Sequence, residues 1–126
     1  MIDLHLHTTA SDGRCTPREL VERVASSGVS MMAVTDHDTV AAVAEVRAVA
    51  LDSGMQAISG VEITAVEEGL DIHMLGYLFD PLDETLSAFL LTSRAARIAW
   101  VIVLDPITIV PWRSTPLDPR LMPPSA

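Results

Sequence analysis

Residues 3–13 read DLHLHTTASDG, and this stretch decides both the fold and where to look for a site. His5 and His7 occupy alternate positions of an apolar run, and an Asp-Gly turn follows. Side chains two apart on a β-strand project to the same face, roughly 6.6 Å from one another at about 3.3 Å rise per residue. Two imidazoles placed in this way can converge on one ion.

Strand-like and helix-like segments alternate along the rest of the chain. We expect strands over residues 2–6, 30–35, 55–64 and 70–79. A helix should begin at Pro17, with Thr16 as N-cap and Glu19 completing a capping box, and end at Gly28. A second helix is expected over about 39–53, with Asp38 as its N-cap, and a third over 85–97, after a turn at 81–84. This alternation predicts an α/β fold with a parallel sheet and functional residues at the carboxyl ends of its strands.

Composition limits the classes of function. The chain has 126 residues, 49% of them hydrophobic, which suits one domain with a core. A net charge of -9 opposes long-range attraction to nucleic acid or to an anionic membrane. A single cysteine, Cys15, excludes an internal disulfide. We expect a cytoplasmic protein, because no secretory signal is visible and the longest uncharged apolar run, residues 98–104, is too short to span a membrane.

Residues able to bind a metal gather at successive predicted strands, after the first two, at the end of the third and within the fourth, and they include all four histidines of the chain. Imidazole and carboxylate together are the ligand mix of zinc, manganese and iron sites. The set is His5, His7, Asp12, Asp36, His37, Glu62 and His73. One alternative is a simple binding domain in which the histidines hold a single structural zinc; His73 taken alone also suits a core histidine.

Four motifs in order, DLHLHTTASDG, AVTDHDTVAAV, ISGVEITA and DIHMLGY, resemble the PHP (polymerase and histidinol phosphatase) family. The resemblance covers residues 1–97 and is nearest to the family's phosphoesterases for nucleoside 3',5'-bisphosphates and short RNA 5' ends. It implies a distorted TIM-like barrel of seven βα units, of which this chain would supply about the first half. It also implies a cluster of up to three divalent ions (Mn, Zn or Fe), with fewer held by this chain.

The resemblance assigns the ligands. His5, His7 and Glu62 would hold one metal; Glu62 would bridge to a second that His73 also binds; Asp12 and His37 would hold the third. The implied reaction is hydrolysis of a phosphomonoester of a nucleotide or oligonucleotide end by metal-activated water, with Asp12 or His37 as proton donor.

Supporting roles are assigned from chemistry. Asp3 and Asp36 could accept the outer N–H of a ligating imidazole, and helix capping is the alternative for Asp36. Arg94 and Arg97 share a helical face that could contact a substrate phosphate; a solvated face is the alternative.

The family pattern stops after residue 97. No histidine follows His73, so six of about nine expected ligands are present, and six of the eight prolines lie within residues 106–126. We expect an N-terminal part of a PHP domain over 1–97 and a divergent, loosely ordered tail over 98–126, as in a truncated or frame-shifted product. Half a barrel would leave sheet edges unpaired and favour self-association. The alternatives kept open are histidinol phosphate as substrate and a non-catalytic PHP-like module or inert fragment.

Overall fold

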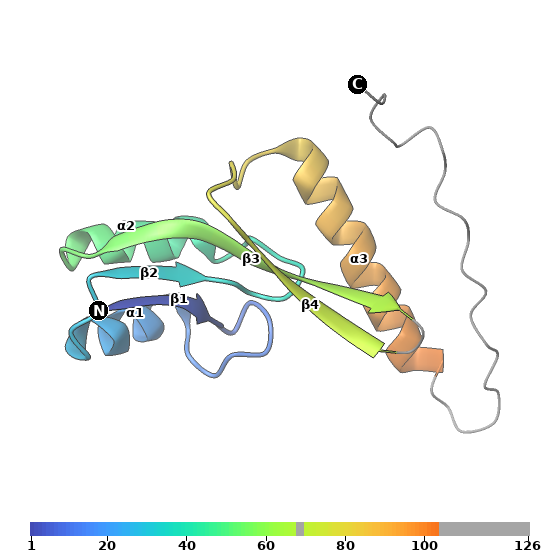
Figure 1. Ribbon diagram of the computed structural model, residues 1–126, viewed down its shortest axis with the longest axis horizontal. Helices are drawn as coiled ribbons and strands as arrows, with labels where there is room; N and C mark the ends of the chain where they lie inside the picture. The colour runs from blue at the N-terminus through green and yellow to red at the C-terminus, as the bar shows by residue number, and fades with distance from the viewer. Residues whose placement is uncertain (68–69, 104–126) are drawn as a thin grey trace.

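The computed structural model describes residues 1–67 and 70–103, with side chains for 1–66 and 70–96. Its elements in chain order are β1 (Ile2–Leu6), α1 (Pro17–Ser26), β2 (Met31–Val34), α2 (Val43–Asp52), β3 (Gln56–Glu67), β4 (Leu70–Tyr77) and α3 (Glu84–Val103). The strands form one sheet in the order β1-β2-β3-β4 (Figure 1). β2 pairs in parallel with both β1 and β3, whereas β4 runs antiparallel to β3.

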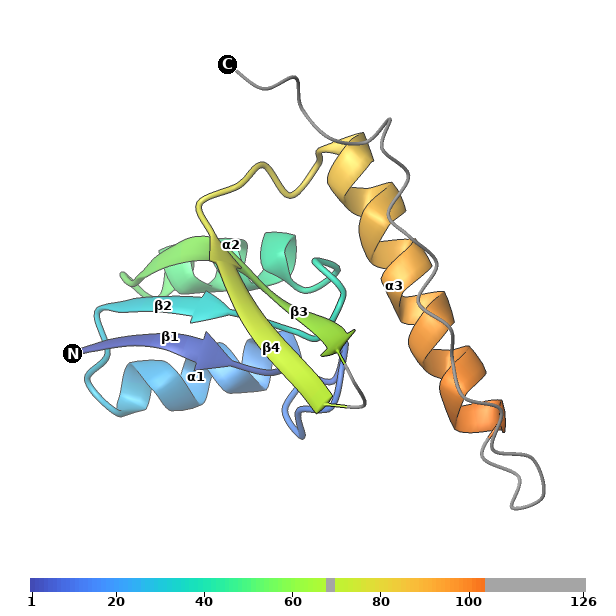
Figure 2. The same ribbon diagram turned by 45° about the vertical axis from the view of Figure 1, so that its right-hand side comes forward.

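One hydrophobic core holds the sheet against α1 and α2. Leu20, Val21 and Val24 of α1 meet Met32 and Val34 of β2, and the α2 contribution consists of Val43, Val46, Val49 and Ala50. The helix α3 stands apart from this pair, beyond the β3–β4 hairpin (Figure 2). The face of the sheet opposite α1 and α2 is therefore the one on which polar side chains can gather.

The start of α1 follows the local signals in the sequence. Thr16 Oγ1 accepts a hydrogen bond from the Glu19 amide at 3.3 Å, and the Glu19 carboxylate accepts one from the Thr16 amide at 2.9 Å. This reciprocal capping box satisfies two amides that the helix itself leaves unpaired. The predicted helix start is confirmed, as is its end near Gly28, whose φ of 76° suits glycine.

The prediction of an all-parallel sheet is wrong for β4. Only residues 68 and 69 separate β3 from β4. A parallel connection needs a dozen or more residues to cross over, so such a short link forces a hairpin. The partial barrel therefore consists of two βα units followed by a β-hairpin.

The second helix also differs from its prediction, because it begins at Val43 rather than near Thr39. Asp38 is not its N-cap: Asp38 has a φ of 49°, and its carboxylate accepts a hydrogen bond from the Thr64 amide at 3.1 Å. Ala42 takes the cap position without a side-chain hydrogen bond. A contact 26 residues away has replaced the local capping role.

The sheet curls strongly enough to bring its two outer strands together. The Tyr77 hydroxyl of β4 donates a hydrogen bond of 2.8 Å to the Leu4 carbonyl of β1. Across a flat sheet these strands would be three spacings apart, roughly 14 Å. The curl fits a partial barrel.

The end of α3 lies beyond the predicted boundary at residue 97. Residues 98–103, expected to begin the loosely ordered tail, instead continue this helix. The proposed tail beyond them falls outside the described residues. Within the described part, we find no helix with both the length and the apolar character that crossing a membrane requires.

Candidate metal centre

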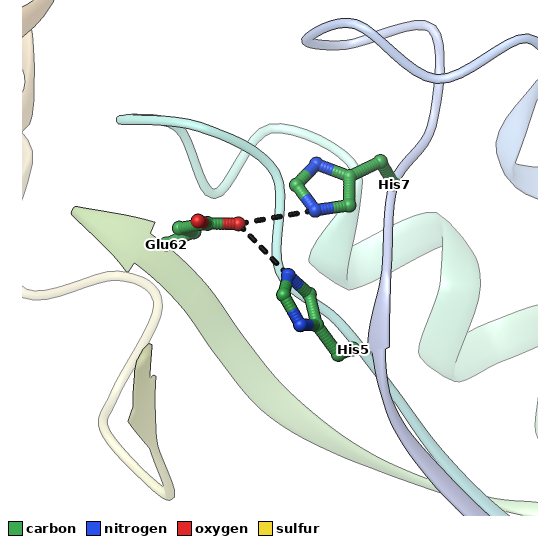
Figure 3. Close-up of side chains that lie close together, drawn as sticks. All are labelled: His5, His7 and Glu62. Carbon is green, nitrogen blue, oxygen red and sulfur yellow. Dashed lines mark hydrogen bonds and ion pairs between the residues drawn. The ribbon is translucent and has the colours of Figure 1, made fainter. Parts of the chain in front are cut away.

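Glu62 is the point on which the histidines converge. Its side chain is 4% exposed, and its carboxylate Oε2 lies 3.0 Å from His5 Nε2 and 3.1 Å from His7 Nε2. Figure 3 shows both imidazoles directed at this one oxygen. The other oxygen, Oε1, lies 2.5 Å from His73 Nδ1, and His37 Nε2 is 3.9 Å from Oε2. All four histidines of the chain therefore surround a single carboxylate.

β1 delivers two of these histidines because its register shifts. The strand pairs Asp3 with Met32 but Leu6 with Val34, so one extra residue of β1 lies between those two pairs. Such irregularities re-aim side chains next to functional sites. Leu6 remains against the core, while His5 and His7 face Glu62, with ring centroids 5.2 Å apart.

His37 reaches Glu62 through a short stretch of parallel pairing beyond β2. The Glu62 amide donates to the Asp36 carbonyl at 3.2 Å, and the Asp38 amide donates to the Glu62 carbonyl at 2.9 Å. These two bonds place His37 directly beside Glu62. The positive φ of Asp38 turns the chain away immediately afterwards.

β4 brings His73 from the opposite direction. His73 pairs with Thr64 in the antiparallel register. Residues 62 and 64 share one face of β3, so His73 is the diagonal neighbour of Glu62 on that face. His73 lies within β4, as predicted for the strand over residues 70–79, and the hairpin, not a strand's carboxyl end, brings it to Glu62.

Asp12 joins the cluster from the loop after β1. Asp12 Oδ1 lies 3.1 Å from His7 Nδ1, and Asp12 Oδ2 lies 3.6 Å from His37 Nε2. The structure thus contains three groups whose ligand atoms lie within 4.8 Å of one another. They are His5–His7–Glu62, His7–Asp12–His37 and His37–Glu62–His73.

Asp36 is buried and shapes this loop rather than contacting an imidazole. Its Oδ1 accepts hydrogen bonds from the Thr8 amide at 2.7 Å and the Ser11 hydroxyl at 2.6 Å, and its Oδ2 accepts one from the Thr8 hydroxyl at 2.7 Å. These bonds fix the residues that flank Asp12. Both roles predicted for Asp36, imidazole partner and helix cap, are therefore replaced by loop anchoring.

Asp3 likewise contacts backbone instead of a ring. Its carboxylate accepts a hydrogen bond from the His5 amide at 3.3 Å. It acts on the main chain that carries the histidine, in contrast to the predicted bond to the imidazole.

Thr64 is the residue that sequence reasoning missed. Its hydroxyl lies 3.2 Å from His37 Nδ1, which fixes the ring so that Nε2 faces Asp12. Hydrogen bonding at the outer nitrogen is what orients a metal-binding imidazole. The sequence carried a signal: Thr64 lies two residues from Glu62 and so on the same face of the strand.

The carboxylates at the centre are held in their charged form. Burial raises the pKa of Glu62, but hydrogen bonds from His5 and His73 and the nearby His37 lower it more, so the net shift is downward. For Asp12, burial likewise raises the pKa, but the nearby His37 and His7 and hydrogen bonds to the carboxylate together outweigh it, so its pKa is lowered. Metal ligands must be deprotonated, so both shifts favour binding of a cation.

The donor geometry fits a divalent metal. Two ligands that each lie about 2.0–2.2 Å from one ion are themselves roughly 3 Å apart, as His5 and His7 are from Glu62. His7 Nδ1 is buried and has no hydrogen-bond partner among the described residues, although Asp12 is close by. A buried imidazole nitrogen that faces a carboxylate without a hydrogen bond suits a cation shared by the two.

Arg94 lies at a distinct feature beside the centre. It lines a cleft of about 270 Å³ between α3 and the segment that precedes α2, together with Asp38, Thr39, Val40, Ala41, Ser87, Leu90 and Leu91. Its side chain is exposed, and the cleft adjoins the residue after His37. The Arg97 side chain lies outside the described residues.

Comparison with known proteins places this geometry in context. The family described as PHP domain matches residues 3–103. A 5'-3' exoribonuclease from Haemophilus influenzae is 43% identical over 95 residues, which cover 75% of this chain and 35% of that protein. A 3',5'-nucleoside bisphosphate phosphatase from Chromobacterium violaceum is 36% identical over 97 residues, covering 77% of this chain and 34% of that protein.

A solved structure shares the fold as well as the sequence. It comes from Bifidobacterium adolescentis, is described as a candidate metal-dependent phosphoesterase, and superposes with a TM-score of 0.72 at 38% identity. The match covers 85% of this chain and 40% of that one. The chain thus spans about a third of the length of the curated relatives it matches.

Proposed function

The chain belongs to the PHP domain family, and from that premise we propose that its histidine–carboxylate cluster is part of a metal-dependent phosphoesterase centre. The proposed substrates are phosphomonoesters of nucleotides or of oligonucleotide ends; in support, one relative is named a 3',5'-nucleoside bisphosphate phosphatase and another a 5'-3' exoribonuclease. The proposed ligands are His5, His7, Asp12, His37, Glu62 and His73. The proposed cofactors are Mn, Zn or Fe ions, which imidazole and carboxylate ligands suit.

One observation supports this proposal above the others: Glu62 belongs to two of the three ligand groups. A carboxylate shared in this way could serve as ligand to two cations, as two-metal hydrolytic sites require. A single structural zinc would need only one such group. The arrangement therefore favours the phosphoesterase over the simple zinc-binding domain.

The chain's own residues divide the work. Metal ions bound here would polarise a phosphoryl oxygen and lower the pKa of a water so that hydroxide is available near neutral pH. His5 lies on β1, His7 directly follows it, and Glu62 lies on β3; these three would hold one ion. His73 on β4 lies on the other side of Glu62 and would hold the next. Asp12, whose side chain is 68% exposed and held in its charged form, is proposed to accept a proton, and His37 beside it to donate one to the leaving group. Arg94 on α3 is proposed to contact a phosphate at the neighbouring cleft.

The protein's own charge makes the metals important for substrate binding. The chain carries a net charge of -9, which repels a phosphate. Three divalent ions would add six positive charges and leave -3, with the positive part concentrated at Glu62. Substrate affinity should therefore depend on metal loading.

We also propose a cytoplasmic location and self-association of the chain. A single cysteine and no disulfide partner suit the cytoplasm. The outer edges of β1 and β4 have no strand partner within the described residues, which supports self-association. Sedimentation velocity over a range of protein concentrations tests the second point.

The test is a phosphatase assay with Mn²⁺ on a nucleoside 3',5'-bisphosphate. We expect phosphate release by the wild-type chain, none by His7→Ala, and wild-type rates for Glu22→Gln, a matched change of one charged residue on the exposed face of α1. Histidinol phosphate serves as the competing substrate. Equal background rates in all three proteins, with Mn²⁺ bound, would instead support a non-catalytic metal-binding module.

A further inference from the structure

Tyr77 connects the two outer strands of the curled sheet. It is the only tyrosine of the chain, and it sits at the end of β4, the strand that carries His73. Its hydroxyl donates to the carbonyl of Leu4, the residue that precedes His5 in β1. The separation in sequence is 73 residues, so this bond is a tertiary tie rather than a local one.

The fold leaves a path for the tyrosine ring toward β1. Tyr77 lies directly opposite Gly60 in the antiparallel register, so both occupy one face of the sheet. Glycine has no side chain to block the ring, and a Cβ there would lie 2.7 Å from the Val34 carbonyl oxygen. Gly60 therefore allows two features of the curled sheet: β3 approaches β2 closely, and the Tyr77 ring extends across Gly60 toward β1.

The location of this tie relates it to the metal centre. β1 supplies His5 and His7, β4 supplies His73, and all three contact Glu62 on the strand between them. Hydrogen bonds within the sheet join β4 to β3 and β1 to β2, but β1 and β4 are not neighbours. A tie between them sets how far the sheet closes around Glu62.

We infer that Tyr77 is a positioning residue: its hydroxyl holds β4 against β1 at the closure that lets His73 and His5 share Glu62. The inference rests on the proposed metal centre and extends it, because Tyr77 itself is no ligand. Its substitution should change the geometry of the imidazoles without removing any of them.

Ser59 offers a matched control. Its hydroxyl donates to the Phe79 carbonyl at 2.7 Å, so it also makes one hydroxyl-to-carbonyl bond at the same end of the hairpin. That bond joins β3 to Phe79, two residues past the end of β4, and does not involve β1. Tyr77→Phe and Ser59→Ala therefore each remove one hydroxyl of the same kind, and only the first loosens the tie between the outer strands.

The first measurement needs no metal. At pH 8, proton NMR resolves the ring signals of the four histidines, whose centroids lie 4.8–5.2 Å apart in a chain from His5 to His73. In Tyr77→Phe we expect the His5 and His73 ring signals to shift, because ring currents depend on these separations. In Ser59→Ala we expect them to stay at their wild-type positions. Unshifted histidine signals in a folded Tyr77→Phe protein would overturn the inference.

The second measurement adds Mn²⁺ alone. Wild-type protein and Ser59→Ala should show an exchange-coupled EPR signal from a bridged Mn²⁺ pair, whereas Tyr77→Phe should lose the coupling and bind the second ion about 10-fold more weakly. Identical coupling and affinity in all three proteins would refute the role of Tyr77 while leaving the proposed centre intact. If wild-type protein binds no Mn²⁺, the proposed function fails, and the NMR result still decides whether Tyr77 positions the imidazoles. Circular dichroism confirms that each variant is folded.

Discussion

Glu62→Gln should dismantle two of the three ligand groups and spare the third. Glu62 contributes to the His5–His7–Glu62 and His37–Glu62–His73 groups, while His7–Asp12–His37 does not use it. Glutamine keeps the size of the side chain and one carbonyl oxygen but loses the charge. The number of tightly bound Mn²⁺ ions should therefore fall to the one that the remaining group can hold.

The expected loss of metal affinity is large because Glu62 would bind the ions directly. Loss of a residue that only supports a ligand weakens metal binding by about 10–100-fold. Glu62 touches three imidazoles itself, so loss of its charge should weaken each affected site by at least about 100-fold, or about 2.8 kcal/mol at 1.4 kcal/mol per tenfold. In the metal-free protein the same change should lower the unfolding free energy by about 1–3 kcal/mol, because the glutamine carbonyl keeps one buried acceptor oxygen while the other is lost.

Equilibrium dialysis with elemental analysis measures the stoichiometry, and titration calorimetry measures the affinity. Glu22→Gln is the control, because it makes the same chemical change at an exposed position of α1 away from the cluster. The reasoning would be refuted if Glu62→Gln, shown to be folded by circular dichroism, bound as many Mn²⁺ ions as Glu22→Gln with the same affinity.

Three further results are expected. Thr64→Val removes the hydroxyl that orients His37 and should weaken Mn²⁺ binding about 10-fold in titration calorimetry. Thr92→Val, on the exposed surface of α3, is the control. Equal affinities in the two variants would exclude the orienting role. Asp36→Asn replaces a buried carboxylate that accepts three hydrogen bonds, so it should lower the unfolding free energy by about 1–3 kcal/mol. Urea titration measures this change. An unchanged midpoint would contradict the anchoring role of Asp36. The pKa of Glu62 is lowered from its ordinary 4.5, so the unfolded chain takes up that proton first as pH falls, and the metal-free protein should lose stability as pH drops below 4.5 through the folded pKa. Urea midpoints between pH 5 and 3 should fall less in Glu62→Gln, and parallel curves would argue against this linkage.

Local sequence signals predicted the elements whose determinants are local. The capping box at Thr16 and Glu19 and the glycine at position 28 define α1 without help from the rest of the chain. The pairing of His5 with His7 on one face also follows from spacing two residues apart in a strand. These predictions needed no knowledge of the tertiary structure.

The predictions that failed depended on contacts between distant residues. Asp38 precedes a helical pattern and so looks like an N-cap, yet its carboxylate accepts a bond from the Thr64 amide, 26 residues further on. Asp36 stands beside His37 in sequence, but its oxygens bind residues of the loop after β1. The sequence shows which nearby backbone groups a polar side chain could bind, but it does not show the distant donor that the side chain binds instead.

The antiparallel β4 also determines how the centre is built. Glu62 and His73 are 11 residues apart and meet through the register of one hairpin, so their contact closes a short loop. His5 and Glu62 are 57 residues apart and meet only when β1, β2 and β3 pair in parallel and the sheet curls. Closing the longer loop loses more chain entropy, and it also depends on the core that α1 and α2 provide. The Glu62–His73 contact therefore rests on one hairpin, whereas His37 needs the parallel pairing of β2 with β3 and the His5–His7 side depends on the whole fold. Changes that loosen β1 should weaken that second group first.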